Sequence, residues 1–136
     1  MKKIILLAMI LFLVTGCGKE KVTCTYENKE LNYKNKRTLL ITFEEEKVFN
    51  LKSTIEEEYT DEIDANNAYI AYQNKYNNYN ENDVVSEYKK EDKKITAIYT
   101  ISYRDIQNKK IEFEFDVNLS QDALLKNLKE QGYKCK

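Results

Sequence analysis

Cysteine offers the most specific chemistry in this sequence. The chain has three cysteines, Cys17, Cys24 and Cys135, and no histidine. A thiol can accept an acyl group or form a disulfide bond. The lack of histidine excludes a His-dependent catalytic triad, a His-ligated metal site and imidazole acid–base catalysis. The surroundings of the three thiols therefore provide the first information about function.

Cys17 stands directly after an export signal. The chain begins with Met1-Lys2-Lys3, continues with an apolar run over residues 4–14, and then has Thr15-Gly16 before Cys17. A charged start, an apolar stretch and small residues are the parts of a secretory signal peptide. The apolar run is too short to cross a hydrocarbon core of about 30 Å, which takes about 20 residues as a helix. We expect residues 1–16 to be a signal peptide and not a permanent transmembrane anchor.

The four residues Val14-Thr15-Gly16-Cys17 resemble the lipobox of bacterial lipoproteins. In that family the signal is cleaved just before the cysteine, whose sulfur carries fatty acyl chains such as palmitate. Two or three chains hold a protein on a membrane, whereas a single chain binds only marginally. The resemblance implies lipidation at Cys17 and a location at the extracytoplasmic face of the cell membrane. The alternative is an ordinary secretory signal, with Cys17 free or disulfide-bonded.

The predicted organisation leaves little chain between the lipid and the folded domain. We expect a signal peptide over 1–16, a lipidated tether over 17–21 and a single domain over 22–136, since the length supports no second domain. Gly18 to Lys21 would reach about 14 Å when extended. The domain should therefore act close to the bilayer.

With Cys17 used for lipid, Cys24 and Cys135 remain as an even pair in an exported domain. Disulfides persist in that oxidising environment. Cys24 lies in the first predicted strand, and Cys135 follows Gly132 by three residues, so the last residues can run back beside the sheet. We predict a bond between Cys24 and Cys135 that joins the two ends of the domain. Two free thiols are the alternative.

The alternation of apolar and polar residues predicts antiparallel strands. An apolar residue at every second position is typical of a strand with one buried face. Glu44-Glu45-Glu46 is the expected hairpin turn, and the polar residues 28–35 look like a second turn. The segments that alternate or are rich in β-branched and aromatic residues are 22–27, 38–43, 49–58, the region of Val85, 95–103 and 111–117.

Two helices complete the predicted fold. Asp61 is an N-cap candidate ahead of a tyrosine stripe at helical spacing. Ser120 is the N-cap candidate of the second helix, which should end at Gly132 in a left-handed conformation, with Tyr133 folded back on Leu128. The stripe consists of Tyr69, Tyr72, Tyr76 and Tyr79. The predicted class is α+β, an antiparallel sheet of about six strands with two helices in the order βββαβββα.

Several of these features together are similar to the YehR-type small bacterial lipoproteins. The resemblance implies an antiparallel sheet with helices, and no assigned activity. It supplies no catalytic or ligand-binding residues, and paired cysteines are not a general mark of that group. It is carried by the lipobox, the passage from helix to strand over Tyr76–Val85, the segments Ile95–Tyr103 and Ile111–Val117, and the closing Leu124-Leu125-Lys126 and Gln131-Gly132-Tyr133-Lys134.

The tyrosine stripe has two interpretations. A helix that packs on a sheet needs an apolar stripe on its buried side, and tyrosine can supply it. Alternatively, Tyr76 and Tyr79 could form part of an aromatic platform for a sugar or peptide, with nearby asparagines adding hydrogen bonds. We expect packing to account for most of the stripe, with Tyr79, nearest the helix end, as the exception.

The acidic residues do not predict a metal site. Adjacent residues of a strand point to opposite faces, so neither Glu44-Glu45-Glu46 nor Glu56-Glu57-Glu58 presents three carboxylates to one ion. We expect both triplets to be solvated. Glu112, Glu114 and Asp116 alternate with apolar residues and should form a solvent-facing side or pair with lysines of a neighbouring strand.

The composition argues for binding and against catalysis. With 22 Lys+Arg and 23 Asp+Glu, the chain lacks the basic footprint of a nucleic-acid binder. Three glycines leave no phosphate-binding loop. We expect a monomeric, non-enzymatic lipoprotein without cofactor or metal, which binds an unidentified envelope partner at the membrane. The alternatives are a small-ligand or glycan receptor with exposed tyrosines and asparagines, and a hydrolase that uses a carboxylate pair.

Overall fold

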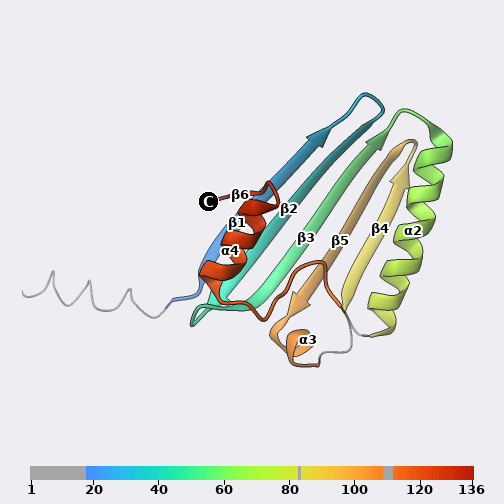
Figure 1. Cartoon of the computed structure of the whole chain (residues 1–136). Coiled ribbons are helices and arrows are strands. Elements are labelled where there is room, and N and C mark those ends of the chain that lie inside the picture. Colours follow the sequence, from blue (N-terminus) through green and yellow to red (C-terminus); the bar gives the residue numbers. More distant parts are fainter. Residues whose placement is uncertain (1–17, 83, 109–111) are drawn as a thin grey trace, which may run out of the picture.

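The computed structural model describes residues 18–82, 84–108 and 112–136 (Figure 1). The predicted signal peptide and Cys17 lie outside the described residues, which form six strands and three helices. In chain order these are β1 (Glu20–Lys29), β2 (Tyr33–Glu44), β3 (Lys47–Tyr59), α2 (Glu62–Glu81), β4 (Val85–Glu91), β5 (Lys94–Ser102), α3 (Tyr103–Asn108), α4 (Gln121–Glu130) and β6 (Lys134–Cys135).

The six strands form one antiparallel sheet in the order β4-β5-β3-β2-β1-β6. Strands β1, β2 and β3 follow one another as hairpins. Helix α2 then carries the chain to the edge strand β4, and β5 returns between β4 and β3. Helix α4 lies over β1 and β2, whereas α2 runs along β4 (Figure 1). The predicted α+β class with an antiparallel sheet of about six strands is confirmed.

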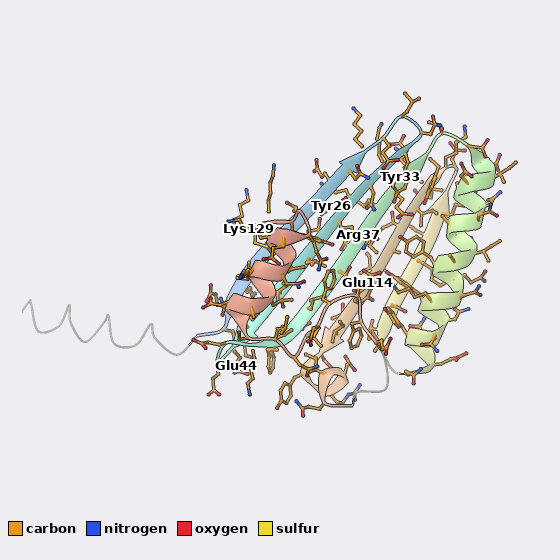
Figure 2. The ribbon with its side chains drawn as sticks, viewed as in Figure 1. Tyr26, Tyr33, Arg37, Glu44, Glu114 and Lys129 are labelled. Carbon is orange, nitrogen blue, oxygen red and sulfur yellow. A yellow bond between two sulfur atoms is a disulfide. The ribbon has the colours of Figure 1, made fainter. Side chains whose placement is uncertain are left out.

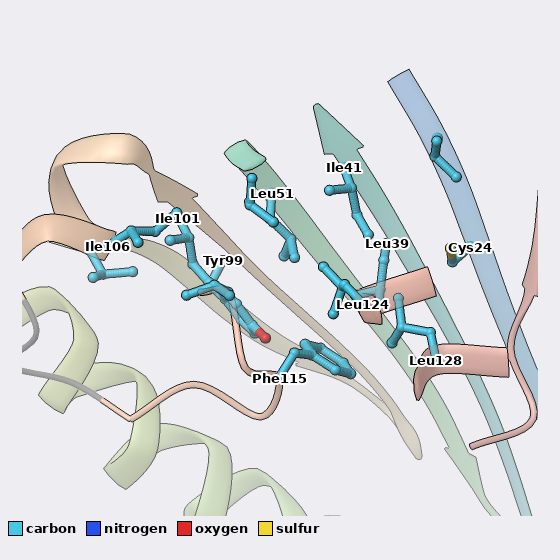
Figure 3. Close-up of a cluster of buried hydrophobic side chains, with 14 of the residues drawn as sticks. Cys24, Leu39, Ile41, Leu51, Tyr99, Ile101, Ile106, Phe115, Leu124 and Leu128 are labelled. Carbon is cyan, nitrogen blue, oxygen red and sulfur yellow. The ribbon is translucent and has the colours of Figure 1, made fainter. Parts of the chain in front are cut away.

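The core lies on one face of the sheet, which we call the covered face. Leu124 and Leu128 of α4 pack over Leu39 of β2 (Figure 3). On the opposite face the side chains remain half-buried or exposed, as at Thr38 and Leu40. The fully buried strand residues on the covered face include Cys24, Leu39, Ile41, Phe43, Leu51, Ser53, Ile55, Ile95, Ala97, Tyr99 and Ile101.

Both predicted N-caps are present. The carboxylate of Asp61 accepts hydrogen bonds from the backbone N–H groups of Ile63 and Asp64, at 2.7 and 3.2 Å. The hydroxyl of Ser120 accepts one from the backbone N–H of Ala123 at 3.4 Å. These bonds satisfy donors that the first turn of a helix leaves unpaired.

The predicted helix stop at Gly132 is also confirmed. Gly132 has φ +95°, a conformation that glycine adopts without the steric cost of a Cβ. The backbone N–H of Tyr133 donates to the carbonyl of Leu128 and that of Gly132 to the carbonyl of Lys129, both at 3.0 Å. This pair of bonds is a Schellman motif. It turns the chain back toward β1.

The predicted strand over 111–117 is wrong for residues 112–117, whereas residue 111 lies outside the described residues. Residues 112–119 form no strand and cross the covered face between α2 and α4; we call them the strap. Strand β5 is already paired with β3 and β4 on its two sides, so the chain that follows it has no adjacent strand to join. Phe115 and Val117 are buried in the core, which explains the alternation of apolar and polar residues without a ladder of hydrogen bonds.

Two element boundaries and one short helix also differ from prediction. The turn after β1 covers only residues 30–32, since the polar residues on either side continue the ladder. Helix α3 was not predicted, although Ser102 and Asp105 form a reciprocal cap at its start that the sequence S-x-x-D could have indicated. Strand β1 begins at Glu20, so only Gly18 and Lys19 separate it from Cys17.

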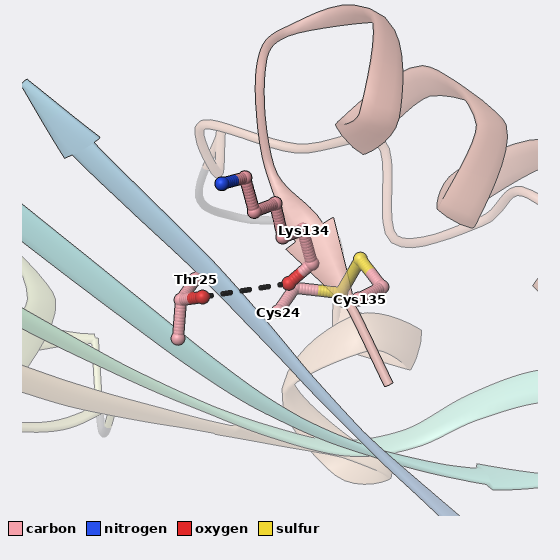
Figure 4. The surroundings of a disulfide bond; sticks show 4 residues. All are labelled: Cys24, Thr25, Lys134 and Cys135. Atoms are coloured by element: carbon pink, nitrogen blue, oxygen red, sulfur yellow. Dashed lines mark hydrogen bonds between the residues drawn. A yellow bond between two sulfur atoms is a disulfide. The ribbon is translucent and has the colours of Figure 1, made fainter.

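Cys24 and Cys135 lie opposite each other in the pairing of β1 with β6, and their sulfur atoms are 2.01 Å apart, at bonding distance (Figure 4). The backbones of Thr23 and Lys136 exchange two hydrogen bonds of 2.9 and 3.0 Å, and Thr25 Oγ1 lies 3.5 Å from the Lys134 carbonyl oxygen. The pairing of β6 with β1 therefore places the two cysteines directly opposite each other.

Reduction of this disulfide should destabilise the domain strongly. The bond closes a loop of 111 residues in sequence separation. The chain-entropy model gives about 4–5 kcal/mol for such a loop, because the bond restricts the unfolded chain. Urea unfolding of a chain starting at Gly18, with and without reductant, measures the difference. A Cys24→Ala/Cys135→Ala variant should not respond to reductant. Two reactive thiols in the denatured, unreduced protein would contradict the prediction.

Candidate functional site

The covered face carries a buried carboxylate at the end of β3. Glu57 is only 6% exposed and follows Leu51, Ser53 and Ile55 at every second position, so its side chain points to the covered face. Tyr33 and Tyr59 lie opposite each other in the pairing of β2 with β3. The β-strand alternation thus forces Glu57 into the core region, and the expectation that Glu56-Glu57-Glu58 is solvated is wrong for Glu57.

Three tyrosine hydroxyls satisfy this carboxylate. Tyr33 and Tyr72 donate to Oε1 of Glu57 and Tyr59 donates to Oε2, each at 2.8 Å. Tyr72 comes from α2, so the interaction joins the helix to the sheet. An unpaired buried carboxylate would be costly, whereas hydrogen bonds to a charged group are the stronger kind. We call Glu57 and its three donors the Glu57 cluster.

The tyrosines of this cluster keep their protons far above neutral pH. Burial, the hydrogen bond to Glu57 and its charge raise the pKa of Tyr33 to about 12. The same effects, led by burial, raise the pKa of Tyr59 and Tyr72 even further. A general acid or base works best with a pKa near the operating pH. The arrangement therefore suits hydrogen-bond donation and not proton transfer.

A second polar group lies where the strap crosses the sheet. Arg37 of β2 and Glu114 of the strap lie side by side between α4 and α2 (Figure 2), with 3.2 Å between the guanidinium and a carboxylate oxygen. Lys75 of α2 forms an ion pair with the other carboxylate oxygen. The side chains of Glu114, Arg37 and Lys75 are 25%, 28% and 36% exposed, so the network is partly shielded from water.

This contact corrects the expectation for the acidic residues of the strap. Glu114 is exposed, as expected, but its carboxylate is paired, and the lysine that pairs with it belongs to a helix and not to a neighbouring strand. Its partners are a helix lysine and a strand arginine, because the strap crosses the sheet and does not extend it. Glu112 and Asp116 are exposed, as the alternation predicts.

The tyrosines next to this network are packed in the core. Tyr76 and Tyr79 are 0% and 3% exposed, and the ring of Tyr99 on β5 lies 5.9 and 5.2 Å from theirs. Their burial agrees with the packing interpretation of the stripe, including at Tyr79, for which exposure was expected. Neither ring face is open to a sugar or peptide, so the aromatic-platform alternative does not fit these two residues.

The hydroxyl groups of Tyr76, Tyr79 and Tyr99 are buried without a hydrogen-bond partner among the described residues. Burial and the nearby charge of Glu114 raise the pKa of Tyr79 to about 12 and those of Tyr76 and Tyr99 further. Buried polar groups are normally paired, so each exception calls for an explanation. The core near the strap therefore contains three buried hydroxyl groups that could form hydrogen bonds.

Two hollows border these elements. One of about 390 Å³ lies between α3 and the strap, and its lining includes Asp105, Ile106 and Glu112. The other, of about 400 Å³, lies at the end of the sheet near Lys34 and Glu56 and carries both signs of charge. In the part of the chain that the structure describes, no group of three His, Cys, Asp or Glu side chains could hold a metal ion.

Comparisons with known proteins gave no match, whether against protein-family models, curated proteins or solved structures. Among the described residues, no helix has both the length and the apolar character needed to cross a membrane. The site must therefore be interpreted from its own chemistry. The sequence analysis did not predict most of the residues of this site. One signal was available: Glu57 continues the every-second-position pattern of Leu51 and Ile55, which could have indicated a buried acid.

Removing one hydroxyl from the Glu57 cluster should destabilise the fold. Tyr72→Phe deletes the only donor from α2, and a hydrogen bond to a charged group contributes about 1.5–3 kcal/mol. The matched control is Tyr69→Phe on the same helix, whose ring contacts Tyr88 and which should change stability by less than about 0.5 kcal/mol. Equal losses in urea unfolding of the two variants would contradict the prediction.

Stability should also fall at high pH. The unfolded chain releases tyrosine protons near pH 10, whereas the folded protein holds those of Tyr33 and Tyr79 to about pH 12. Since the folded pKa values are raised, the contribution of these tyrosines to the unfolding free energy is fully present below pH 10 and is lost as the pH rises from about 10 to 12. Tyrosinate absorbance should therefore titrate later in the native protein than in denaturant. Superimposed titration curves would contradict the prediction.

Proposed function

We propose that this protein is a non-enzymatic lipoprotein, anchored through Cys17, that binds a partner at the outer face of the cytoplasmic membrane. The observation that carries the proposal is Val14-Thr15-Gly16-Cys17 directly after an export signal. Similarity to YehR-type lipoproteins, on the residues given above, agrees with it. A chain with two or three acyl groups stays on the membrane.

The start of β1 supports action close to the bilayer. Gly18 and Lys19 alone separate Cys17 from the first strand, and two extended residues span about 7 Å. The ammonium of Lys19 lies 3.6 Å from the centre of the Phe49 ring, which fastens even this short segment to the sheet. A domain attached in this way meets partners at the membrane surface.

The chemistry of the polar groups supports binding. The buried tyrosines have pKa values far above neutral, and the acids of the covered face are engaged by tyrosine, arginine or lysine. Hydrogen-bond donors and fixed charges recognise ligands without a titrating group. We therefore favour a binding domain over a carboxylate hydrolase.

The Cys17→Ala variant tests the anchor. Without the acyl acceptor, the protein should leave the membrane fraction or accumulate uncleaved, because no lipid then holds it. Immunoblots of membrane and soluble fractions from the native host measure this. Thr25→Ala, which leaves Cys17 intact, should stay with the membranes. Cleaved Cys17→Ala protein that remains fully membrane-bound would refute the proposal, and crosslinking in intact cells can then identify partners of the anchored protein.

A further inference from the structure

The strap is held by side chains in a groove between the two long helices. Its Phe113 ring lies 6.1 Å from that of Tyr79, and its Phe115 ring lies 6.0 Å from that of Tyr133, which follows α4. Glu114 stands between the two rings and meets Arg37 from the sheet below. The strap therefore presents an acidic residue flanked by two aromatic residues. The acid contacts Arg37, and the two rings contact Tyr79 and Tyr133.

The groove has more positive charges and hydrogen-bond donors than the strap pairs with. Arg37 and Lys75 bring two positive charges to the single carboxylate of Glu114. The hydroxyl of Tyr99 is directed toward Phe115 (Figure 3), and like those of Tyr76 and Tyr79 it has no partner among the described residues. A segment that belongs permanently to a core is expected to satisfy the buried polar groups beneath it. The strap leaves three donors unpaired.

The strap also has room to leave. The hollow of about 390 Å³ is lined by the strap together with Asp105 and Ile106 of α3, so part of the strap borders unfilled space. Among the residues that the structure describes, few backbone groups of the strap and its junction with α4 form hydrogen bonds. The Leu119 N–H donates to the Asp116 carbonyl at 3.3 Å, the Asn118 N–H to the Asp116 carboxylate at 3.0 Å, and the Gln121 N–H to the Glu46 carbonyl at 2.8 Å. These bonds lie at its C-terminal end, so the portion from Phe113 to Phe115 can lift out while the junction with α4 stays in place.

We propose that the strap is an internal ligand, and that its groove binds an extended peptide of a partner with an acidic side chain between two aromatic ones. The guanidinium of Arg37 and the ammonium of Lys75 would hold the acid, and Tyr79 and Tyr133 the aromatic rings. The unpaired tyrosine hydroxyls supply donors for peptide carbonyls or further acidic groups. This deepens the proposed partner binding and rests on it, but not on the lipid anchor.

An added peptide must compete with the strap for the groove, and this competition lowers the affinity of the protein for the peptide. A peptide can bind only the fraction of molecules whose strap is out, so the apparent affinity of the native protein is reduced by that fraction. Weakening the strap without touching the groove should therefore tighten binding. Phe113→Ala/Glu114→Gln removes one ring contact and both ion pairs of the strap and leaves Arg37, Lys75 and the tyrosines unchanged.

The test uses a fluorescent peptide with the sequence of residues 112–118, EFEFDVN, and a control peptide with glutamine in the central acidic position. Fluorescence anisotropy should show the acidic peptide binding the double variant about tenfold more tightly than the unaltered protein, since the weakened strap competes less. Glu112→Gln, on an exposed residue of the strap, should bind as the unaltered protein does. Adding Arg37→Gln to the double variant should abolish the preference for the acidic peptide.

Several results would overturn the inference. One is a folded double variant that binds both peptides alike, or no more tightly than the unaltered protein. Another is a dimer that exchanges straps between copies and excludes the peptide. If the double variant does not fold, Glu114→Gln alone is the test, with a smaller gain of about threefold expected. Failure here leaves the membrane fractionation of Cys17→Ala unaffected, so the two proposals can be rejected separately.

Discussion

Helix α2 packs on the sheet through tyrosines. The need to pair the hydroxyl groups of these tyrosines determines how the helix is positioned. Its aliphatic residues Ile63 and Ile70 are exposed, so they contribute little to the docking. The rings of Tyr76 and Tyr79 supply the apolar contact instead. A tyrosine that enters a core carries a polar tip that must be paired or else costs free energy. The sheet provides Glu57 for the tip of Tyr72, and this bond fixes the helix over the end of β3.

The two polar groups to which α2 contributes a side chain are built differently. In the Glu57 cluster both carboxylate oxygens are used and the donors come from three elements, as in a structural junction. Around Glu114 the charges are unequal and the neighbouring hydroxyls of Tyr76, Tyr79 and Tyr99 are unpaired. Complete pairing rigidifies a core, whereas incomplete pairing leaves capacity for another molecule. This contrast is the basis for assigning a structural role to the Glu57 cluster and for proposing binding at the group around Glu114.

The two ends of the domain meet on β1. Two residues separate Cys17 from this strand, which lies between β2 and β6 in the sheet. The Schellman motif at Gly132 brings the last residues to its edge, where Cys135 lies opposite Cys24. A membrane anchor before β1 would therefore pull on a strand that is paired on both sides and crosslinked to the C-terminus. Such a strand resists local unfolding better than a free edge does.

The sequence by itself determined the local elements. Asp61, Ser120 and Gly132 are helix signals that act through bonds to neighbours within a few residues, and the alternation over β2 and β3 follows from one buried face. Only the tertiary structure decided what residues 112–119 do. Their alternation requires a buried side but not a paired strand, and the free edges of the sheet depend on how β3, β4 and β5 are ordered. Likewise, Tyr33, Tyr59 and Tyr72 meet at Glu57, and Arg37 meets Glu114 across 77 residues. These contacts arise when separate elements pack together. The spacing of residues along the chain does not indicate which distant residues become neighbours in space.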